Sequence, residues 1–311
     1  MLSRADQLIK EGRGEEALSI LRAAVARDPA DSIVCIRLGK AFYQLKKYQE
    51  TITALTSCRM TVAKDNVTYR EVIQMLGLSH YILGHVAESI PFFQQSIEWF
   101  PDNLEIAYAL GVSYVQTRQP GESRKIYARL FGVAPDSAAA YLINAQMHIR
   151  QRFEETAEVE LLQALKLDAR LPQANFHLGE IAIYKADIEK GITTFQKEIS
   201  VNPSNAMAYY RLGEALTRQL KWDQAIQPLQ KSIWLNPYFS GPYIVLGKVY
   251  LKKGDLKNSE AMLRRSIAMD PNNFGAHHLL AQTLQQDGRI DEAKKEFALA
   301  EQLRAGGERN P

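Results

Sequence analysis

The sequence predicts an all-α solenoid built from about nine two-helix repeats. Three features of the 311-residue chain lead to this prediction. Prolines recur at a fixed interval, a Leu-Gly pair recurs in the same phase, and each interval holds one small and one large apolar residue at fixed positions. A hairpin with one apolar face cannot bury that face alone, so neighbouring hairpins must stack.

The prolines set the length and the phase of the repeat. Pro101, Pro135, Pro203, Pro237 and Pro271 are separated by 34, 68, 34 and 34 residues. Proline lacks an amide hydrogen and clashes with the preceding turn, so it ends the second helix of each hairpin. With proline at position 32, repeats begin at Ser32, Arg70, Leu104, Ala138, Pro172, Ala206, Ser240 and Phe274.

The residues inside each repeat follow the close packing of two antiparallel helices. Position 8 is Gly or Ala in every repeat from Gly39 to Ala281, and position 20 is small throughout. Small residues at these positions allow the two helices to approach closely, and a large side chain at position 24 fills the space beside the contact. Position 24 holds Leu21, Leu55, Phe93, Tyr127, Leu161, Phe195, Leu229, Leu263 and Phe297.

These positions resemble the tetratricopeptide repeat, whose pattern is W-x2-L-G-x2-Y, then A-x3-F, then P. The resemblance covers essentially the whole chain and implies a right-handed superhelix. It also implies a concave groove lined by the first helices, where a peptide or protein would bind. The predicted array spans residues 1–304, followed by a flexible tail at 305–311. Its repeats are 1–31, 32–69, 70–103, 104–137, 138–171, 172–205, 206–239, 240–273 and 274–304.

Several repeats depart from the pattern. The step from Ser32 to Arg70 is 38 residues, four more than the period, which predicts a second helix lengthened by about one turn. Repeat 138–171 carries Asn144 and Ala145 in place of Leu-Gly, and the next repeat carries Glu198 where other repeats have small or apolar residues. We therefore expect residues 138–200 to be less tightly packed than the rest.

Composition excludes several classes of protein. The chain has 38 basic and 35 acidic residues, and this balance does not indicate a nucleic-acid-binding protein. No apolar run approaches the ~18 residues that would span a bilayer. The N-terminus lacks the apolar segment of a signal peptide, so the expected location is cytoplasmic. The first repeat starts in the middle of its pattern, and a signal peptide absent from the sequence would make the protein exported.

Sequence motifs for catalysis, cofactors or metals are absent, and we expect neither an enzyme nor a cofactor or metal site. No GxGxxG, GxxxxGK[ST] or HExxH occurs. His80 and His148 share position 11 and are expected to face the hairpin interior. Cys35 and Cys58 are expected as two buried thiols, with a disulfide as the alternative if the protein is exported.

The predicted partner site lies on the first helices, where positions 2, 5, 9, 12 and 13 point away from the hairpin. This face is apolar in the N-terminal half and mixed in the C-terminal half. The candidate contact residues are Tyr81, Tyr108, Val112, Leu142, Phe176, Glu180, Tyr210, Glu214, Arg218 and Lys248. An alternative is that curvature closes the groove, so that the apolar residues pack on one another.

These features favour a non-enzymatic scaffold that binds a partner protein or peptide, and they do not identify the partner. One alternative is a structural protein that self-associates through the ends of the array. Another is an accessory arm of an enzyme complex.

Overall fold

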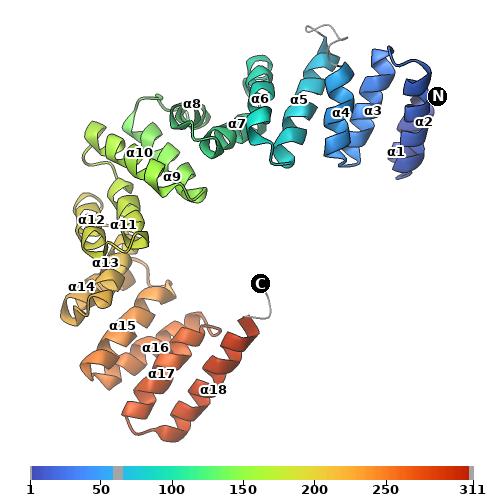
Figure 1. Ribbon diagram of the computed structural model, residues 1–311. Helices are drawn as coiled ribbons and strands as arrows, with labels where there is room; N and C mark the ends of the chain where they lie inside the picture. The colour runs from blue at the N-terminus through green and yellow to red at the C-terminus, as the bar shows by residue number, and fades with distance from the viewer. Residues whose placement is uncertain (1, 59–65, 308–311) are drawn as a thin grey trace. The chain divides into compact units, whose positions relative to one another are not determined.

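The computed structural model describes residues 2–58 and 66–307, which form 18 helices and, within those ranges, no strand. Contacts divide the chain into two compact units, residues 1–160 and 161–311. Figure 1 labels the helices of both. The prediction of an all-α repeat fold is confirmed. The boundary between the two units falls within α10.

Unit 1 holds the first five hairpins. Its helices are α1 (Leu2–Lys10), α2 (Gly14–Arg27), α3 (Ser32–Gln44), α4 (Tyr48–Cys58), α5 (Val67–Ile82), α6 (Val86–Trp99), α7 (Leu104–Gln116), α8 (Pro120–Leu130), α9 (Ala138–Arg150) and α10 (Glu154–Leu167), which ends in unit 2.

Unit 2 holds the remaining four. Its helices are α11 (Ala174–Tyr184), α12 (Ile188–Val201), α13 (Ala206–Arg218), α14 (Trp222–Leu235), α15 (Ser240–Lys253), α16 (Leu256–Met269), α17 (Phe274–Gln286) and α18 (Ile290–Gly307). Helix α18 therefore extends three residues into the segment predicted as a tail, and residues 308–311 lie outside the described chain.

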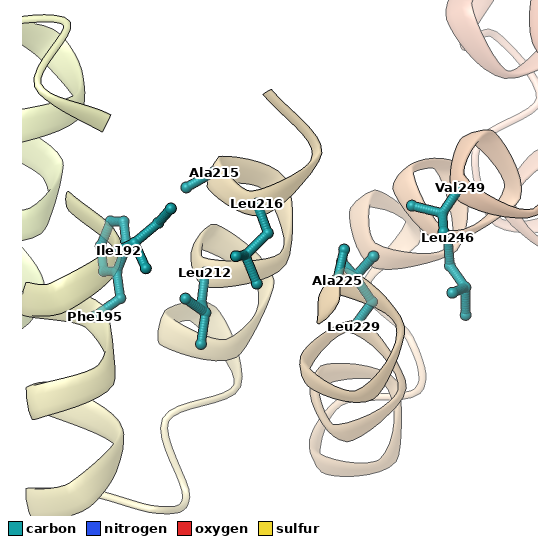
Figure 2. Close-up of a cluster of buried hydrophobic side chains, with 9 residues drawn as sticks. All are labelled: Ile192, Phe195, Leu212, Ala215, Leu216, Ala225, Leu229, Leu246 and Val249. Carbon is teal, nitrogen blue, oxygen red and sulfur yellow. The ribbon is translucent and has the colours of Figure 1, made fainter. Parts of the chain in front are cut away.

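The core of unit 2 runs continuously from one hairpin to the next. Helix α13 packs against both α12 and α14, and α15 packs against α14 and α16. Buried side chains from four successive helices form one cluster, shown in Figure 2. Its members are Ile192, Phe195, Leu212, Ala215, Leu216, Ala225, Leu229, Leu246 and Val249. Each hairpin is thus stabilised by its neighbours, as a stacked array requires.

Glycine at position 8 is required by the side chain at position 24. A Cβ atom added to Gly213 would lie 2.5 Å from Cγ of Leu229, and one added to Gly111 would lie 2.8 Å from the Tyr127 ring. A Cβ atom added to Gly179 would likewise lie 2.5 Å from the ring of Phe195. The close approach predicted from the sequence is confirmed in these hairpins.

Replacing Gly213 with alanine is therefore expected to destabilise unit 2. Overpacking of this kind costs about 1–3 kcal/mol, which exceeds the gain of up to about 1 kcal/mol in helix propensity. The matched control is Gly121→Ala in α8, where an added Cβ has nothing within 4 Å. The control is expected to stabilise by about 0.4–1 kcal/mol. Urea denaturation of both variants tests the pair, and equal effects would contradict the packing argument.

The prediction that the four extra residues near Arg70 lengthen the second helix falls on residues 59–65, outside the described residues. Helix α4 is described from Tyr48 to Cys58, and α5 from Val67 to Ile82, where it has 16 residues. Part of the insertion therefore extends the first helix of the next repeat, where the Asn66 side chain accepts a hydrogen bond from the amide of Thr68. The remainder falls within 59–65, outside the described residues.

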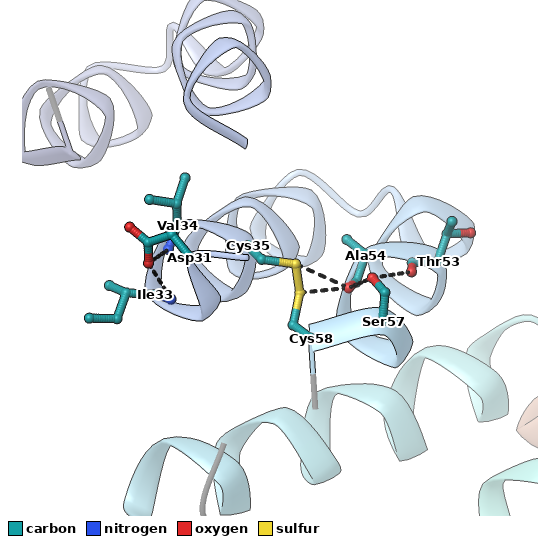
Figure 3. The surroundings of a disulfide bond; sticks show 8 residues. All are labelled: Asp31, Ile33, Val34, Cys35, Thr53, Ala54, Ser57 and Cys58. Carbon is teal, nitrogen blue, oxygen red and sulfur yellow. Dashed lines mark hydrogen bonds between the residues drawn. A yellow bond between two sulfur atoms is a disulfide. The ribbon is translucent and has the colours of Figure 1, made fainter. Parts of the chain in front are cut away.

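Cys35 and Cys58 form a disulfide between α3 and α4, so the expectation of two free thiols is wrong (Figure 3). Their Cα atoms are 6.1 Å apart, within the range that a disulfide spans. Both sulfur atoms also lie close to the carbonyl oxygen of Ala54, at 3.5 Å and 2.9 Å. The bridge closes the hairpin at the end opposite to its turn.

Asn144 does not leave a packing defect where the pattern has leucine. Its side chain is fully buried and bonds three groups: it accepts from the Ser123 hydroxyl at 2.7 Å, and donates to Glu160 at 2.8 Å and to the carbonyl of Pro120 at 3.0 Å. Arg124 completes the network by donating to Glu160 at 3.1 Å. Polar contacts replace the apolar packing of this repeat.

Glu198 likewise stabilises a helix end. Its buried carboxylate accepts hydrogen bonds from the backbone amides of Gln173 at 2.9 Å and Phe176 at 3.3 Å, at the start of α11. Gln173 itself provides no side-chain cap, so a residue of α12 satisfies amides that a helix N-terminus leaves unpaired. The looser packing expected from Asn144 and Glu198 is therefore not what the structure shows at these two residues.

His148 should make unit 1 less stable in acid. The residue is 1% exposed, and Nδ1 is 2.9 Å from the carbonyl oxygen of Asn144. Nε2 is buried and has no hydrogen-bond partner in the part of the chain that the structure describes. Burial lowers the pKa of His148, although the Asn144 carbonyl and Glu160 oppose the shift. The unfolded chain titrates near ~6.5, so below that pH it takes up a proton that the folded state resists, and the free energy of unfolding falls.

The measurement is denaturant unfolding of unit 1 followed between about pH 7.5 and about pH 5.5. His148→Asn keeps a donor for the Asn144 carbonyl and should flatten the loss in acid. The exposed His278 supplies the control, since His278→Asn should leave the slope unchanged. An unaltered slope in His148→Asn would assign the acid sensitivity to other groups.

Candidate functional site

The candidate site consists of the outward residues of the first helices, described for each unit separately. We call positions 2, 5, 9, 12 and 13 of these helices the first-helix surface. In unit 1, α3 contacts α5 and α7 contacts α9, and in unit 2, α13 and α17 both contact α15. Within each unit, the first-helix surfaces of these successive repeats therefore lie next to one another.

In unit 1 the apolar residues of this surface divide into exposed and buried sets. Tyr108 is 46% exposed, Ile33 is 62% exposed and Ile82 is 50% exposed, while Tyr81 and Leu142 are half-buried. These five side chains are available to a partner.

Val112 is a correction to the predicted site, because it is only 5% exposed. Ile36 and Val115 are also buried, at 5% and 0%. Ile36 packs with Leu55 and Leu76, and Val115 packs with Tyr127 and Met147, so part of the apolar face belongs to the core and part remains open.

Tyr108 and Tyr81 rest on the large residues at position 24. The rings of Tyr108 and Tyr127 meet edge-on with their centroids 6.3 Å apart, and those of Tyr81 and Phe93 do so with their centroids 5.8 Å apart. Burial raises the pKa of Tyr81 and that of Tyr127. The Tyr127 hydroxyl is buried beneath Gly111 and has no hydrogen-bond partner among the described residues. The structure adds Tyr127 to the site, as the support of Tyr108.

In unit 2, charged residues of the first-helix surface form a network centred on Arg211, which stands at position 6, beside that surface. Arg211 binds Glu180 through two hydrogen bonds of 2.6 and 2.9 Å, and binds Glu214 at 2.5 Å. The Glu180 hydrogen bond raises the pKa of Arg211 more than any other interaction. Arg218 then pairs with Glu214 at 3.1 Å.

Arg211 was absent from the predicted site, although a sequence signal for it exists. Charged residues at position 9 pair with the next first helix: Glu180 binds Arg211, and Lys40 binds Glu71, each pair being 31 residues apart. Lys248 occupies the same position, but the next helix offers Gly275 and Leu279 at positions 2 and 6. Lys248 is exposed and forms no ion pair with any residue of the described chain.

Aromatic residues flank this network. Phe176 is half-buried and its ring lies 6.0 Å from that of Phe195. Tyr210 is half-buried against Phe239, with the ring centroids 5.0 Å apart, and burial raises the pKa of Tyr210. Burial also lowers the pKa of His177, against the opposing charge of Glu180. The surface of unit 2 is therefore charged with aromatic borders, whereas that of unit 1 is mainly apolar and carries the Lys40–Glu71 pair.

The ends of the array carry shallow pockets. One of about 410 Å³ lies on the α17–α18 hairpin and is lined by Phe274, His278, Phe297, Ala300, Glu301 and Arg304. Another of about 300 Å³ lies on the α1–α2 hairpin and is lined by Arg4, Ser19, Ile20 and Ala23. Among residues 2–58 and 66–307, no cluster of three metal-ligating side chains occurs. In the same ranges, no helix is long and apolar enough to cross a membrane.

Family models described as tetratricopeptide repeat match residues 8–66, 82–146, 176–237 and 250–306. The chain belongs to the tetratricopeptide repeat family. Repeats of this family mediate protein–protein interactions, which confirms the coarse class of the predicted function.

Curated relatives of this tetratricopeptide repeat protein are distant. The mouse BBSome complex member BBS4 is 27% identical over 112 residues, covering 36% of this chain and 21% of BBS4. The rat mitochondrial import receptor subunit TOM70 is 24% identical over 213 residues, covering 65% of this chain and 35% of TOM70. The matched regions thus span about a third or less of these relatives.

Solved tetratricopeptide repeat structures share the fold. MamA 41-end from Desulfovibrio magneticus RS-1 is 21% identical with a TM-score of 0.51, over 55% of this chain and 97% of that one. YrrB, described as a TPR protein with an unusual peptide-binding site, is 18% identical with a TM-score of 0.52, over 60% of this chain and 94% of YrrB. At these identities the similarity shows the fold alone.

Proposed function

We propose that this protein is a non-enzymatic scaffold that binds a protein or peptide on its first-helix surface. The observation that carries the proposal is the set of open apolar side chains on α3, α5 and α7 of unit 1, led by Tyr108. Exposed apolar patches on folded proteins mark contact sites, and aromatic anchors supply most of the energy of such interfaces.

The two units supply different parts of the interaction. Apolar contacts in unit 1 provide affinity. The Glu180–Arg211–Glu214–Arg218 network and Lys248 in unit 2 provide orientation and partner choice, because charges at an interface act mainly on specificity and association rate. The peptide-binding site named for YrrB and the receptor role named for TOM70 support this function by family analogy.

Site-specific photo-cross-linking tests the proposal. A photoreactive amino acid replaces Ile82 on the first-helix surface of unit 1, and a second variant carries it at Glu98, which is exposed on α6. In extracts of the native host, the Ile82 variant is expected to capture a partner that the Glu98 variant does not. Capture from Glu98 alone would move the site to the second helices.

Self-association is the second candidate, favoured by the pockets at the α1–α2 and α17–α18 hairpins. In this arrangement the outer surface of one hairpin packs on the other hairpin of a second copy. Sedimentation velocity over a wide concentration range decides the question, and a monomer throughout would exclude it.

The cellular compartment is a separate proposal. Disulfides persist in oxidising compartments, so the Cys35–Cys58 bridge favours the exported alternative over the cytoplasmic expectation. Thiol alkylation of protein taken directly from the host, denatured with and without prior reduction, tests this. Full alkylation without reduction would restore the cytoplasmic expectation.

A further inference from the structure

The second helices of unit 2 carry a basic and aromatic surface on their outward side. In α14, Leu229 and Ser232 are buried at positions 24 and 27, whereas Gln230 and Trp234 are exposed at positions 25 and 29. Positions 22, 25, 26 and 29 therefore point away from the hairpin core, on the side opposite to the first-helix surface. Helices α12 and α16 have the same four positions, and Figure 1 labels all three helices.

Three cations occupy the same position of three consecutive second helices. Lys197, Lys231 and Arg265 all stand at position 26 of their repeats, and none forms an ion pair with another described residue. The remaining outward positions contain no acidic residue in these helices. They hold Thr193, Gln196, Ser200, Gln227, Gln230, Trp234, Ala261, Arg264 and Ala268.

Two aromatic side chains accompany the cations. Trp234 is 71% exposed and Tyr238, just beyond the end of α14, is 84% exposed. The ammonium group of Lys231 lies 3.8 Å from the centroid of the Trp234 ring. Solvation explains cations on the outer face of a helix, but it does not account for an exposed Trp and Tyr beside them.

The second helices of unit 1 differ from these three. The outward positions of α6 hold Pro91, Gln94, Gln95 and Glu98, with no cation and no aromatic residue. Helix α8 carries Arg129 at position 26 and Lys125 at position 22, but Arg129 donates to the carbonyl of Pro101 and Lys125 pairs with Glu122. The net charge of +3 for the whole chain conceals this local concentration of positive charge.

We propose that this surface, formed by Lys197, Lys231, Trp234, Tyr238 and Arg265, docks on an anionic lipid bilayer. Trp and Tyr are favoured at the depth of the lipid headgroups because one part of each ring system is apolar and another is polar. Cations on the same face are attracted to anionic headgroups. The first-helix surface, on the other side of the hairpins, remains free for a protein partner.

A lipid surface fits better than a nucleic acid. Binding of single strands requires open aromatic faces on which bases stack, and one face of Trp234 is covered by the Lys231 ammonium group. At a bilayer that ammonium group is instead placed where the anionic headgroups lie.

Vesicle sedimentation of the full chain tests the proposal. The vesicles contain phosphatidylcholine alone or phosphatidylcholine with phosphatidylserine. We expect binding only with phosphatidylserine, weakened by salt. Lys197→Gln/Lys231→Gln/Arg265→Gln should lower the partition coefficient by about 100-fold, since each cation contributes about fivefold. Trp234→Ala/Tyr238→Ala should lower it by at least about tenfold.

The control removes the same charge elsewhere. Lys10, Lys252 and Lys257 are exposed and lie outside the surface, so Lys10→Gln/Lys252→Gln/Lys257→Gln should bind nearly as well as the native chain. Equal losses in the control and in the Lys197 triple variant would overturn the proposal. So would equal binding to neutral vesicles, or displacement from vesicles by a single-stranded oligonucleotide through the same residues.

Discussion

Replacing Arg124 with alanine is expected to lower the stability of unit 1 by about 3–5 kcal/mol. The side chains of Arg124 and Glu160 are only 15% and 7% exposed, and their hydrogen bonds measure 3.1 and 3.3 Å. The guanidinium also lies 3.9 Å from the centroid of the Tyr141 ring and donates to the carbonyl of Pro135 at 3.1 Å. Without it, the buried side chain of Glu160 loses its cationic partner.

Two variants show whether the loss comes from the unpaired charge. Lys125→Ala removes an exposed cation next to Arg124, in the same helix, whose pair with Glu122 contributes less than about 1 kcal/mol. Arg124→Leu/Glu160→Met removes both charges and should recover most of the stability, because apolar replacements of buried pairs are often tolerated. Urea unfolding followed by hydrogen exchange in α8 and α9 measures all three. A double variant as unstable as Arg124→Ala would assign the loss to packing.

The repeat pattern predicted the architecture because its determinants are local. The close approach of Gly213 to Leu229 depends on two residues at a fixed spacing within one hairpin, so a periodic reading of the sequence finds it. Positions of large residues in the core followed for the same reason.

Contacts between repeats were harder to predict. Glu198, in α12, accepts a hydrogen bond from the backbone amide of Gln173 at the start of α11. Asn144, in α9, donates hydrogen bonds to Pro120 of α8 and Glu160 of α10. Each polar residue breaks the pattern at its own position, and its partners appear only when the neighbouring helices are placed. The sequence showed the departures, and the structure shows that the departures are hydrogen-bonded.

The turns within the hairpins gave no recognisable signal. Position 15 has a positive φ in all nine repeats, yet glycine fills it only at Gly12, Gly84, Gly254 and Gly288. The other repeats use Lys46, Arg118, Arg152, Ala186 and Leu220. These residues accept a left-handed conformation that costs roughly 1 kcal/mol, because helix packing on both sides of the turn determines the backbone there.

Exposure on the first-helix surface was also only partly predictable. Helical periodicity places Tyr108 and Val112 on one face of α7, but it does not predict their different exposure. Tyr108 is 46% exposed although its ring contacts Tyr127 of its own hairpin, whereas Val112 is 5% exposed.

Truncating Tyr108 to alanine is expected to weaken partner binding by about 1–3 kcal/mol, a loss of roughly 5- to 150-fold in affinity. The side chain is 46% exposed and stands on the Tyr127 ring, so a partner that covers it would desolvate an aromatic anchor with rigid support. The cost to folding should be smaller, because the exposed half of the ring contributes nothing to the core.

Val112→Ala, one helical turn away in α7, provides the opposite case. Its side chain is buried, so the variant should lose stability through the cavity it creates while the folded protein keeps its affinity. Melting temperature and affinity for the cross-linked partner, measured side by side for both variants, distinguish an anchor from a packing residue. If Tyr108→Ala lowered the melting temperature strongly and left affinity unaltered, the open apolar face of unit 1 would be part of the core and the binding surface would have to lie elsewhere.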